Sequence, residues 1–267
     1  MGIKFCPIAS SSSGNCIYIG TNDTHILIDA GLSGINIQKG LQALELDAGE
    51  LDAIFVTHEH TDHVRGAGIL SRRFDIPVFA TQKTWTHIER FGSVGNIADK
   101  NRCFVYAGEN CIVNDMAVKA FNIPHDAADP VGYTVSAFGH KVAVATDIGV
   151  ITDTIKENIT DCSAILIESN HDIEMLENGK YPRDLKNRIR SNRGHLSNCS
   201  TGKFLSEIMN ERLKHIFLGH LSEENNLPLV ALDTVTSMLK AVGAFEAYEF
   251  KLCLAERESV SEACVLL

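Results

Sequence analysis

The segment that most constrains this chain is residues 58–63, His-Glu-His-Thr-Asp-His, which places three imidazoles and a carboxylate within six positions. The apolar residues 53–57 predict a buried strand, and residues 64–70 predict the opening of a helix, so the motif should occupy the loop between them. Loops at strand ends commonly carry binding and catalytic side chains. Because a tetrahedral catalytic site uses about three protein ligands plus water, this loop favours two metal ions over one.

Chance gathering of histidines in a solvated loop is the alternative explanation for this motif. The chain has 11 histidines in 267 residues, so three in one window of six would be an improbable accident. His125, Asp147 and His220 each follow an apolar run that predicts another buried strand. Taken alone, Asp147 would be interpreted as a helix cap rather than a metal ligand, but its place in this series favours a metal ligand.

Composition fits a globular protein, with 45% hydrophobic and 22% charged residues, and we expect one domain over residues 1–267. An apolar run of ~18 residues and a signal-peptide core are both missing from the sequence, which predicts a cytoplasmic protein without a membrane span. The eight cysteines include no CxxC pair, as expected for reduced thiols. The net charge of −10 argues against a uniformly basic nucleic-acid-binding surface.

The order of these residues along almost the whole chain resembles the motif series of the metallo-β-lactamase superfamily. The resemblance implies an α/β (α+β) fold, an αββα sandwich of two mixed sheets flanked by helices. Apolar periodicity predicts strands at 3–8, 16–20, 25–29, 103–106, 111–113, 117–123, 131–137, 141–147, 165–168 and 216–219, helices at 33–45, 81–91, 198–213 and 228–241, and a last strand at 244–254. Carried over residue by residue, the resemblance implies one ion on His58, His60 and His125, a second on Asp62, His63 and His220, and Asp147 bridging them.

Four short segments narrow the resemblance to the YycJ (WalJ) group of this superfamily: residues 12–16, 168–172, 194–198 and 219–226. Members of that group are regarded as bacterial DNA nucleases with 5′ to 3′ exonuclease activity on double-stranded DNA. The interval between Asp147 and His220 is too short for the domain inserted in β-CASP nucleases. We therefore expect the loops of the core domain itself to hold DNA.

The resemblance implies hydrolysis of a phosphodiester by a hydroxide that bridges the two ions. Two ions ~3.5–4 Å apart can lower the pKa of a bound water from ~15.7 to nearer ~7 and clamp phosphodiester oxygens. The expected catalytic residues are Asp62 and His195. His195 precedes a predicted helix whose free N–H groups favour a phosphate, and it is the candidate proton donor. His171 is either a wall of the active site or a histidine in a turn.

A basic stretch leads directly to His195, with six positive residues between 180 and 193 against one acid, Asp184. It predicts a groove for the DNA backbone, although such a run can also be a solvated face. The hydroxyl-rich turn at residues 10–15 is the second expected contact region. The expected substrate contacts are Ser13, Asn15, His171, Ser197, Lys186, Arg188, Arg190 and Arg193.

Other functions remain open from the residues alone. A small-molecule hydrolase acting on a cyclic phosphodiester, lactone or thioester would use the same metal site, and a non-catalytic DNA-binding or partner-binding module could retain it. Nitrogen and oxygen ligands do not choose among Zn, Mn and Fe as the two divalent ions. We expect DNA as the partner, no membrane and no nucleotide cofactor, with DNA-repair proteins as candidate partners.

Overall fold

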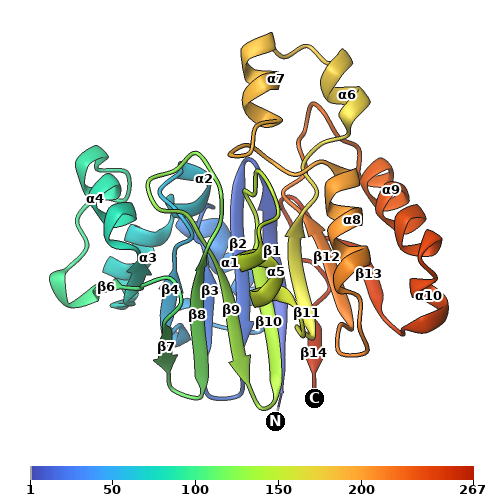
Figure 1. Cartoon of the computed structure of the whole chain (residues 1–267). Coiled ribbons are helices and arrows are strands. Elements are labelled where there is room, and N and C mark those ends of the chain that lie inside the picture. The colour runs from blue at the N-terminus through green and yellow to red at the C-terminus, as the bar shows by residue number, and fades with distance from the viewer. Residues whose placement is uncertain (1) are drawn as a thin grey trace.

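Two β-sheets face each other across a hydrophobic core in the computed structural model, which describes residues 2–267 (Figure 1). Within those residues each sheet has seven strands. Helices pack on the outer face of each sheet, giving two further apolar layers. The αββα sandwich expected from the sequence is confirmed.

The first sheet has the order β14-β1-β2-β3-β4-β5-β6. Its strands are β1 (Ile3–Ser11), β2 (Gly14–Gly20), β3 (His25–Ile28), β4 (Ala53–Phe55), β5 (Val78–Ala80), β6 (Arg102–Phe104) and β14 (Cys264–Leu266). β1 to β3 form the expected antiparallel meander, and β3 to β6 run parallel. Parallel strands end at the same edge of a sheet, so β4 delivers the histidine motif to that edge.

The second sheet has the order β13-β12-β11-β10-β9-β8-β7. Its strands are β7 (Asn110–Val113), β8 (Met116–Asn122), β9 (Val131–Ala137), β10 (His140–Ala145), β11 (Ala164–Glu168), β12 (His215–Gly219) and β13 (Lys251–Leu254). β10 to β13 run parallel, and β8 pairs antiparallel with β9. The ends of β8, β10 and β12 therefore carry their following residues to the upper edge of the sandwich in Figure 1.

The helices divide between the two outer faces and a projecting pair. The first sheet is covered by α1 (Gly34–Ala43), α3 (Ala67–Phe74) and α4 (Gln82–Phe91), with short turns α2 (Thr61–Val64), η1 (Ala48–Glu50) and η2 (Asp99–Asn101). The second is covered by α5 (Asp153–Ile159), α8 (Asn198–Ile208) and α9 (Pro228–Ala241), followed by α10 (Ala244–Ala247). α6 (Ile173–Asn178) and α7 (Arg183–Ile189) rise above the sandwich in Figure 1. Across residues 2–267, none of these helices is long and apolar enough to cross a membrane.

Several predicted elements differ from the structure. The helix expected at 198–213 ends at Ile208, where Met209 turns to an extended conformation. The strand expected at 244–254 begins instead with α10, because Gly243 adopts a φ of 70° and starts a new helical turn. The edge strand β14 was not expected, since three residues are too short for periodicity to identify.

Contacts across the two sheets fix the end of β4 against the second sheet. The Tyr133 hydroxyl on β9 donates a hydrogen bond of 2.8 Å to the carbonyl of Val56. The Val131 amide donates one of 3.0 Å to the carbonyl of Thr57. Phe55 meets the Tyr133 ring edge to face at 5.5 Å. These contacts hold residues 58–63 in place relative to the loops of the second sheet.

Candidate metal centre

The loops at the upper edge of the sandwich bring all seven expected metal ligands together (Figure 1). The ligands follow four different strands, β4, β8, β10 and β12. Their potential ligand atoms form overlapping groups in which the atoms lie within 4.8 Å of one another. Three of these groups are His58, His60 and His125; Asp62, His63 and His220; and His58, His63 and Asp147.

The histidine motif is only partly a loop. β4 ends at Phe55, and Thr61–Val64 already form the helical turn α2, so Asp62 and His63 lie on a helix rather than in the expected loop. His60 has an extended backbone and forms the N-cap of this turn. Asp62 lies in the first turn, where the helix dipole favours a carboxylate. The turn directs both side chains toward His220.

The first group consists of three imidazoles. Nε2 of His58 and Nδ1 of His60 are 3.0 Å apart. Nδ1 of His125 lies 3.3 Å from the carbonyl of Gly194, and donation there would leave Nε2 as the basic atom. That Nε2 is buried and has no hydrogen-bond partner among residues 2–267. Burial lowers the pKa of both His58 and His125, which favours the neutral form that binds metal.

The second group is richer in carboxylates. Nε2 of His63 lies 3.4 Å from a carboxylate oxygen of Asp62 and 3.2 Å from Oδ2 of Asp147. The other oxygen of Asp147 lies 3.3 Å from Nε2 of His220 and 3.8 Å from Nε2 of His125. Asp147 therefore faces residues of both groups, with one oxygen toward His63 and the other toward His220 and His125.

Asp29 is a member of the site that the sequence did not reveal. Its carboxylate is fully buried and lies 2.6 Å from Nδ1 of His63. Thr57 donates to the same carboxylate from its amide and its hydroxyl. The arrangement places a proton on Nδ1 of His63 and turns Nε2 toward Asp147. The sequence contains one indication of this role. Asp29 ends the apolar run of β3, which is the same pattern that identified Asp147 as a candidate ligand.

The electrostatics of the cluster favour a cation. Burial alone would lower the pKa of His63, but Asp29, Asp62 and Asp147 raise it well above its ordinary value. Burial would raise the pKa of Asp147, yet His220 and His63 hold it well below the usual carboxyl range. The ionised forms of these buried carboxylates are therefore stabilised by nearby positive charge. Buried carboxylates and neutral imidazoles with convergent lone pairs fit divalent metal ions.

Three residues of the site have a left-handed backbone conformation. The φ angles are 61° at Asp29, 59° at Asp147 and 54° at His220. This region is uncommon for residues other than glycine, and such strain gathers at functional sites. Asp29 and His220 come directly after their strands, and Asp147 comes one residue later, so the conformation lets the chain turn sharply there.

His195 lies beside the cluster and is oriented by Glu168. Nδ1 of His195 is 2.6 Å from Oε1 of Glu168 and 3.7 Å from Asp147. The other oxygen of Glu168 accepts hydrogen bonds from the amides of Ile148 and Leu196. Burial would lower the pKa of His195, but Glu168 raises it to about 9. The sequence singled out His195, whereas a role for Glu168 depends on its three-dimensional neighbours.

Comparison with known proteins identifies the family of this chain. The sequence model of the beta-lactamase superfamily domain matches residues 24–216. The chain belongs to the metallo-β-lactamase superfamily. It is accordingly a metal-dependent hydrolase, as expected from the ligand series.

Two relatives within the superfamily are similar over nearly the whole chain. The exodeoxyribonuclease YycJ of Bacillus anthracis is 39% identical over 251 residues, covering 93% of this chain and 94% of that protein. The exodeoxyribonuclease WalJ of Streptococcus pneumoniae is 34% identical over 252 residues, covering 94% of each. Zinc-bound PqqB from Methylobacterium extorquens shares the fold, with a TM-score of 0.70 at 16% identity over 97% of this chain and 99% of that one. The predicted membership of the YycJ (WalJ) group is confirmed.

The hydroxyl-rich turn lies beside the metal centre of this superfamily member. β1 and β2 extend to Ser11 and Gly14, so the turn is shorter than expected. Nδ2 of Asn15 lies 3.2 Å from Nε2 of His63 and donates to the carbonyl of Ser11. Ser13 is exposed at the tip. Contact of Asn15 and Ser13 with substrate stays a prediction.

His171 and Ser197 form an isolated bridge between their segments, and neither belongs to a ligand group. Burial lowers the pKa of His171 to about 4, so the ring is neutral. The Ser197 hydroxyl accepts from the amide of Ser200 and caps α8. The Ser200 amide is one of the N–H groups at the start of α8 that were expected to bind a phosphate, and this cap occupies it. Both residues support the loop that carries His195, and their contact with substrate stays a prediction.

The basic stretch is largely engaged within the protein. The Arg193 guanidinium donates hydrogen bonds of 3.0 and 2.9 Å to the carbonyl of His125. Arg188 pairs with Asp126, the residue after that ligand. Lys186 donates to two backbone carbonyls, and Arg190 pairs with Glu177. These four cations therefore tie α6, α7 and the His125 loop together, which the sequence did not predict, and their contact with DNA stays a prediction.

Proposed function

We propose that this hydrolase is a dinuclear-metal phosphodiesterase, a 5′ to 3′ exonuclease on double-stranded DNA that acts in DNA repair or processing. The observation that carries the proposal is the 39% identity to the exodeoxyribonuclease YycJ over 93% of the chain. The gathered set of seven candidate ligands supports a hydrolytic site with two ions. The preference for duplex DNA and the direction of degradation follow from the resemblance to the YycJ (WalJ) group.

The proposed ion sites use the two groups of side chains and the residue between them. His58, His60 and His125 would hold one ion, Asp62, His63 and His220 would hold the other, and Asp147 would contact both. Two divalent ions bound there would acidify a water and stabilise charge on phosphodiester oxygens. The ligand atoms suit Zn, Mn or Fe. Asp29 keeps His63 oriented for this task.

His195 is proposed to protonate the leaving alkoxide of the phosphodiester. Glu168 accepts from Nδ1, which leaves Nε2 of His195 to meet substrate. The side chain is 18% exposed, enough to reach a bound strand from beside Asp147. Glu168 is a positioning residue, because it is fully buried and holds Nδ1 of His195 and the amide of Ile148. Asp62 is the second proposed catalytic residue, through its place in the second ligand group.

The decisive experiment offers the metal-reconstituted protein four substrates. These are duplex DNA labelled at the 5′ end, duplex DNA labelled at the 3′ end, single-stranded DNA and RNA. The proposal expects immediate release of short 5′-labelled products, while the 3′-labelled strand shortens progressively. Hydrolysis of a nitrophenyl phosphodiester, in competition with each nucleic acid, reports whether they share one site.

Three outcomes would reject parts of this function. Progressive shortening of the 5′-labelled strand would reverse the direction. Faster degradation of RNA than of DNA would make RNA the substrate class. Hydrolysis of the nitrophenyl substrate without competition by any nucleic acid would favour the alternative, a small-molecule hydrolase for a cyclic phosphodiester, lactone or thioester.

A further inference from the structure

A polar cavity of about 500 Å³ lies next to the metal centre. Four separate segments line it: the β1–β2 hairpin, the first turns of α1, the residue after α2, and residues 257–260. The lining side chains with hydrogen-bonding or positive groups include Ser11, Ser13, Ser33, Lys39, Arg65 and Arg257. None of these six residues belongs to the candidate ligand groups.

The cavity adjoins the side of the metal centre that holds Asp62, His63 and His220. Arg65 follows His63 by two positions, at the end of α2. Ser11 forms a bridge with Leu221, the residue after His220. One wall of the cavity is therefore built from neighbours of the ligands in chain and in space.

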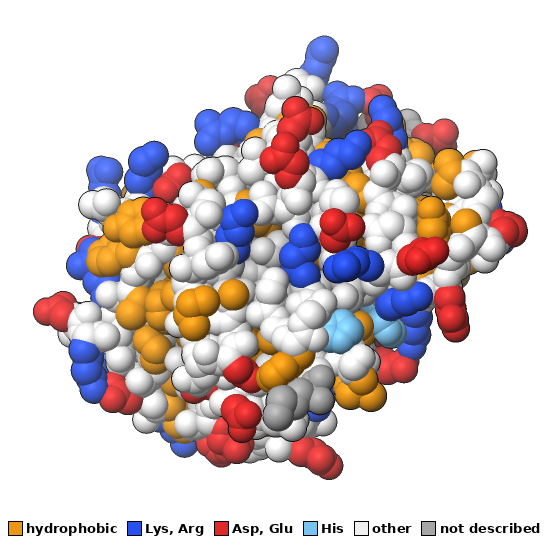
Figure 2. All heavy atoms as spheres, turned by 60° about the horizontal axis from the view of Figure 1, so that its bottom comes forward, with side chains coloured by type: hydrophobic (Ala, Val, Ile, Leu, Met, Phe, Trp, Pro, Cys, Tyr) orange, Lys and Arg blue, Asp and Glu red, His pale blue; other side chains and the backbone are white. Residues whose placement is uncertain are grey.

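The cavity has more positive than negative side chains. Lys39 and Arg65 are exposed, and neither takes part in an ion pair or a side-chain hydrogen bond among residues 2–267. Arg257 lies 3.4 Å from Glu223, whose side chain is 72% exposed, so solvent weakens that pair. Glu258 is the acid in the lining. This excess is local, because the chain has 24 basic against 34 acidic residues, and the face in Figure 2 shows both signs interspersed.

Two serine hydroxyls in the lining accept hydrogen bonds from backbone amides. Ser11 Oγ accepts a hydrogen bond of 3.2 Å from the amide of Ser13. Ser33 Oγ accepts one of 3.3 Å from the amide of Asn36 and caps α1. Because each oxygen already accepts a backbone N–H, its own proton remains available for another acceptor. Free hydroxyl donors beside unpaired cations match the oxygens of a phosphate.

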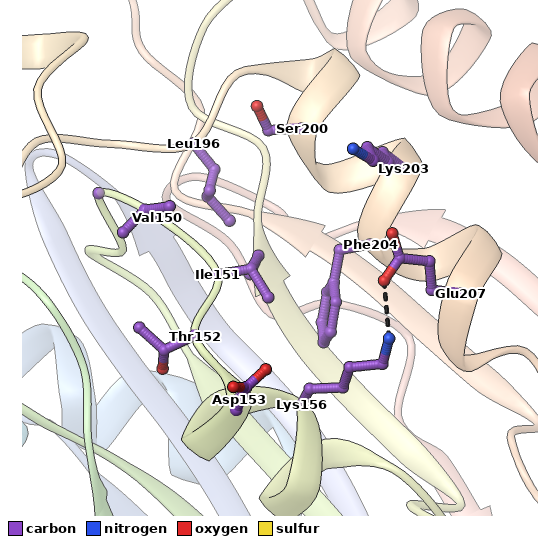
Figure 3. A pocket seen from close by; sticks show the side chains of 11 residues that line it. Val150, Ile151, Thr152, Asp153, Lys156, Leu196, Ser200, Lys203, Phe204 and Glu207 are labelled. Atoms are coloured by element: carbon purple, nitrogen blue, oxygen red, sulfur yellow. Dashed lines mark hydrogen bonds and ion pairs between the residues drawn. The ribbon is translucent and has the colours of Figure 1, made fainter.

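Two other hollows near the site lack this combination. The cavity of about 320 Å³ between α5 and α8 contains Lys156 and Lys203 but also Asp153 and Glu207, and Lys156 points to Glu207 at 2.8 Å (Figure 3). Its charges therefore balance. The hollow of about 330 Å³ at α6 and α7 contains Lys186 and Arg190, which are engaged within the protein, and Arg183, a single cation without a partner among residues 2–267. Neither offers a pair of free cations.

We propose that the cavity between the β1–β2 hairpin, α1 and residues 257–260 binds the sugar-phosphate backbone of DNA next to the linkage held at the metal centre. Lys39 and Arg65 contact neighbouring phosphates, and the hydroxyls of Ser11 and Ser33 donate to their oxygens. This inference rests on the proposed function, and it locates the strand on the His63 and His220 side of the centre.

The test compares two variants that remove the same charge. Lys39→Gln with Arg65→Gln changes the cavity, while Lys83→Gln with Lys240→Gln changes exposed lysines on α4 and α9. Duplex affinity is measured against salt in a His195→Ala background, which slows cleavage during the measurement. Each lost phosphate contact should flatten the slope of log K against log salt by ~0.9. From 50 to 200 mM salt, affinity of the parent should therefore fall about 12-fold more than affinity of the cavity variant.

A second measurement locates the contact on the DNA. Single phosphates near the duplex end are replaced one at a time with neutral methylphosphonates. At one or two positions, the replacement should weaken binding to the parent and to the lysine control but leave the cavity variant unaffected, as in a double-mutant cycle. Metal content and melting temperature of both variants should match the parent, because the substituted side chains are exposed.

The results separate this inference from the proposed function. If the cavity variant keeps the salt slope and the methylphosphonate sensitivity of the parent at every position, the cavity does not hold the backbone. Equal flattening in both variants would mean a general charge effect and would also reject the site. If the parent protein itself neither binds nor degrades duplex DNA, the proposed function fails before the cavity is tested.

Discussion

Oε1 of Glu168 lies 2.6 Å from Nδ1 of His195, and the other oxygen of that carboxylate is held by the amides of Ile148 and Leu196. Glu168 is fully buried, whereas the His195 side chain is 18% exposed. The pair therefore joins a rigid buried carboxylate to an imidazole that can reach substrate. Ile148 directly follows Asp147, so the same carboxylate also fixes the position of the proposed shared ligand.

The first prediction concerns this pair. His195→Ala should keep bound metal and lose ~10²–10⁴-fold in kcat on DNA, the usual worth of general acid catalysis. The loss should be smaller on a nitrophenyl phosphodiester, whose leaving group departs without a proton. Glu168→Gln should lower kcat in the same direction, and the double variant should be no worse than His195→Ala alone. Additive losses would show that Glu168 acts independently of His195.

The second prediction concerns the orientation of His63 by Asp29. Asp29→Asn should weaken metal affinity by roughly 10–100-fold, because the imidazole loses the partner that fixes its tautomer. Calorimetric titration of the metal-free protein with Mn or Zn measures this affinity directly. Asp23→Asn is the matched control, since Asp23 is exposed and lies outside the ligand groups. Unchanged affinity in Asp29→Asn would mean that Thr57 alone orients the ring.

The third prediction tests Asp147 as the shared ligand. Asp147→Ala should reduce the content of both ions and abolish hydrolysis, because its carboxylate faces His63 and His220 of the second group and His125 of the first. Metal analysis by mass spectrometry gives the number of ions per chain. Loss of one ion with full retention of the other would assign Asp147 to a single site, and full occupancy would remove it from the ligand set.

The fourth prediction revises the role expected for the basic stretch. Arg193→Ala should slow turnover of a small phosphodiester about fivefold, roughly 1 kcal/mol, because it removes two hydrogen bonds to the His125 carbonyl from an exposed side chain. The control is Lys180→Ala with Arg183→Ala, two exposed residues without ion pairs among residues 2–267. Those changes should leave small-substrate turnover intact. Normal turnover of the small substrate by Arg193→Ala, together with weaker DNA binding, would instead support the contact of Arg193 with the DNA backbone that the sequence predicted.

The fifth prediction concerns thiol reactivity. Cys199 is the exposed cysteine among residues 2–267, and one thiol per folded chain should react rapidly with Ellman's reagent. Burial raises the pKa of Cys162 and Cys264 to about 12, and that of Cys6 and Cys253 to about 11. Their reactive thiolates form only near those values, so raising the pH from 7 to 9 should leave them unreactive until the protein unfolds. Cys199→Ser should abolish the rapid phase, and its persistence would point to a looser core.

The sequence by itself determined the composition of the candidate metal site. Side-chain chemistry and spacing were enough to select His58, His60, Asp62 and His63 as candidate ligands, because three imidazoles and a carboxylate within six residues are rare by chance. The end of an apolar strand was an equally local signal for His125, Asp147 and His220. Apolar periodicity located most strands and helices, since it records which side of an element is buried. The layer order came from the resemblance, which the fold confirms.

Only the tertiary structure decided which residues act on one another across the chain. Asp29 meets His63, Glu168 meets His195, and Arg193 meets the carbonyl of His125, each pair far apart in sequence. The cavity likewise joins Ser11 and Lys39 to Arg257 near the other end of the chain. A run of basic residues has the same local sequence whether its side chains face solvent or bind neighbouring carbonyls. The residue types give the charge of the segment but not the groups that it contacts. Hydrogen bonds and ion pairs depend on distances of a few ångströms, and those distances are set by how the two sheets pack.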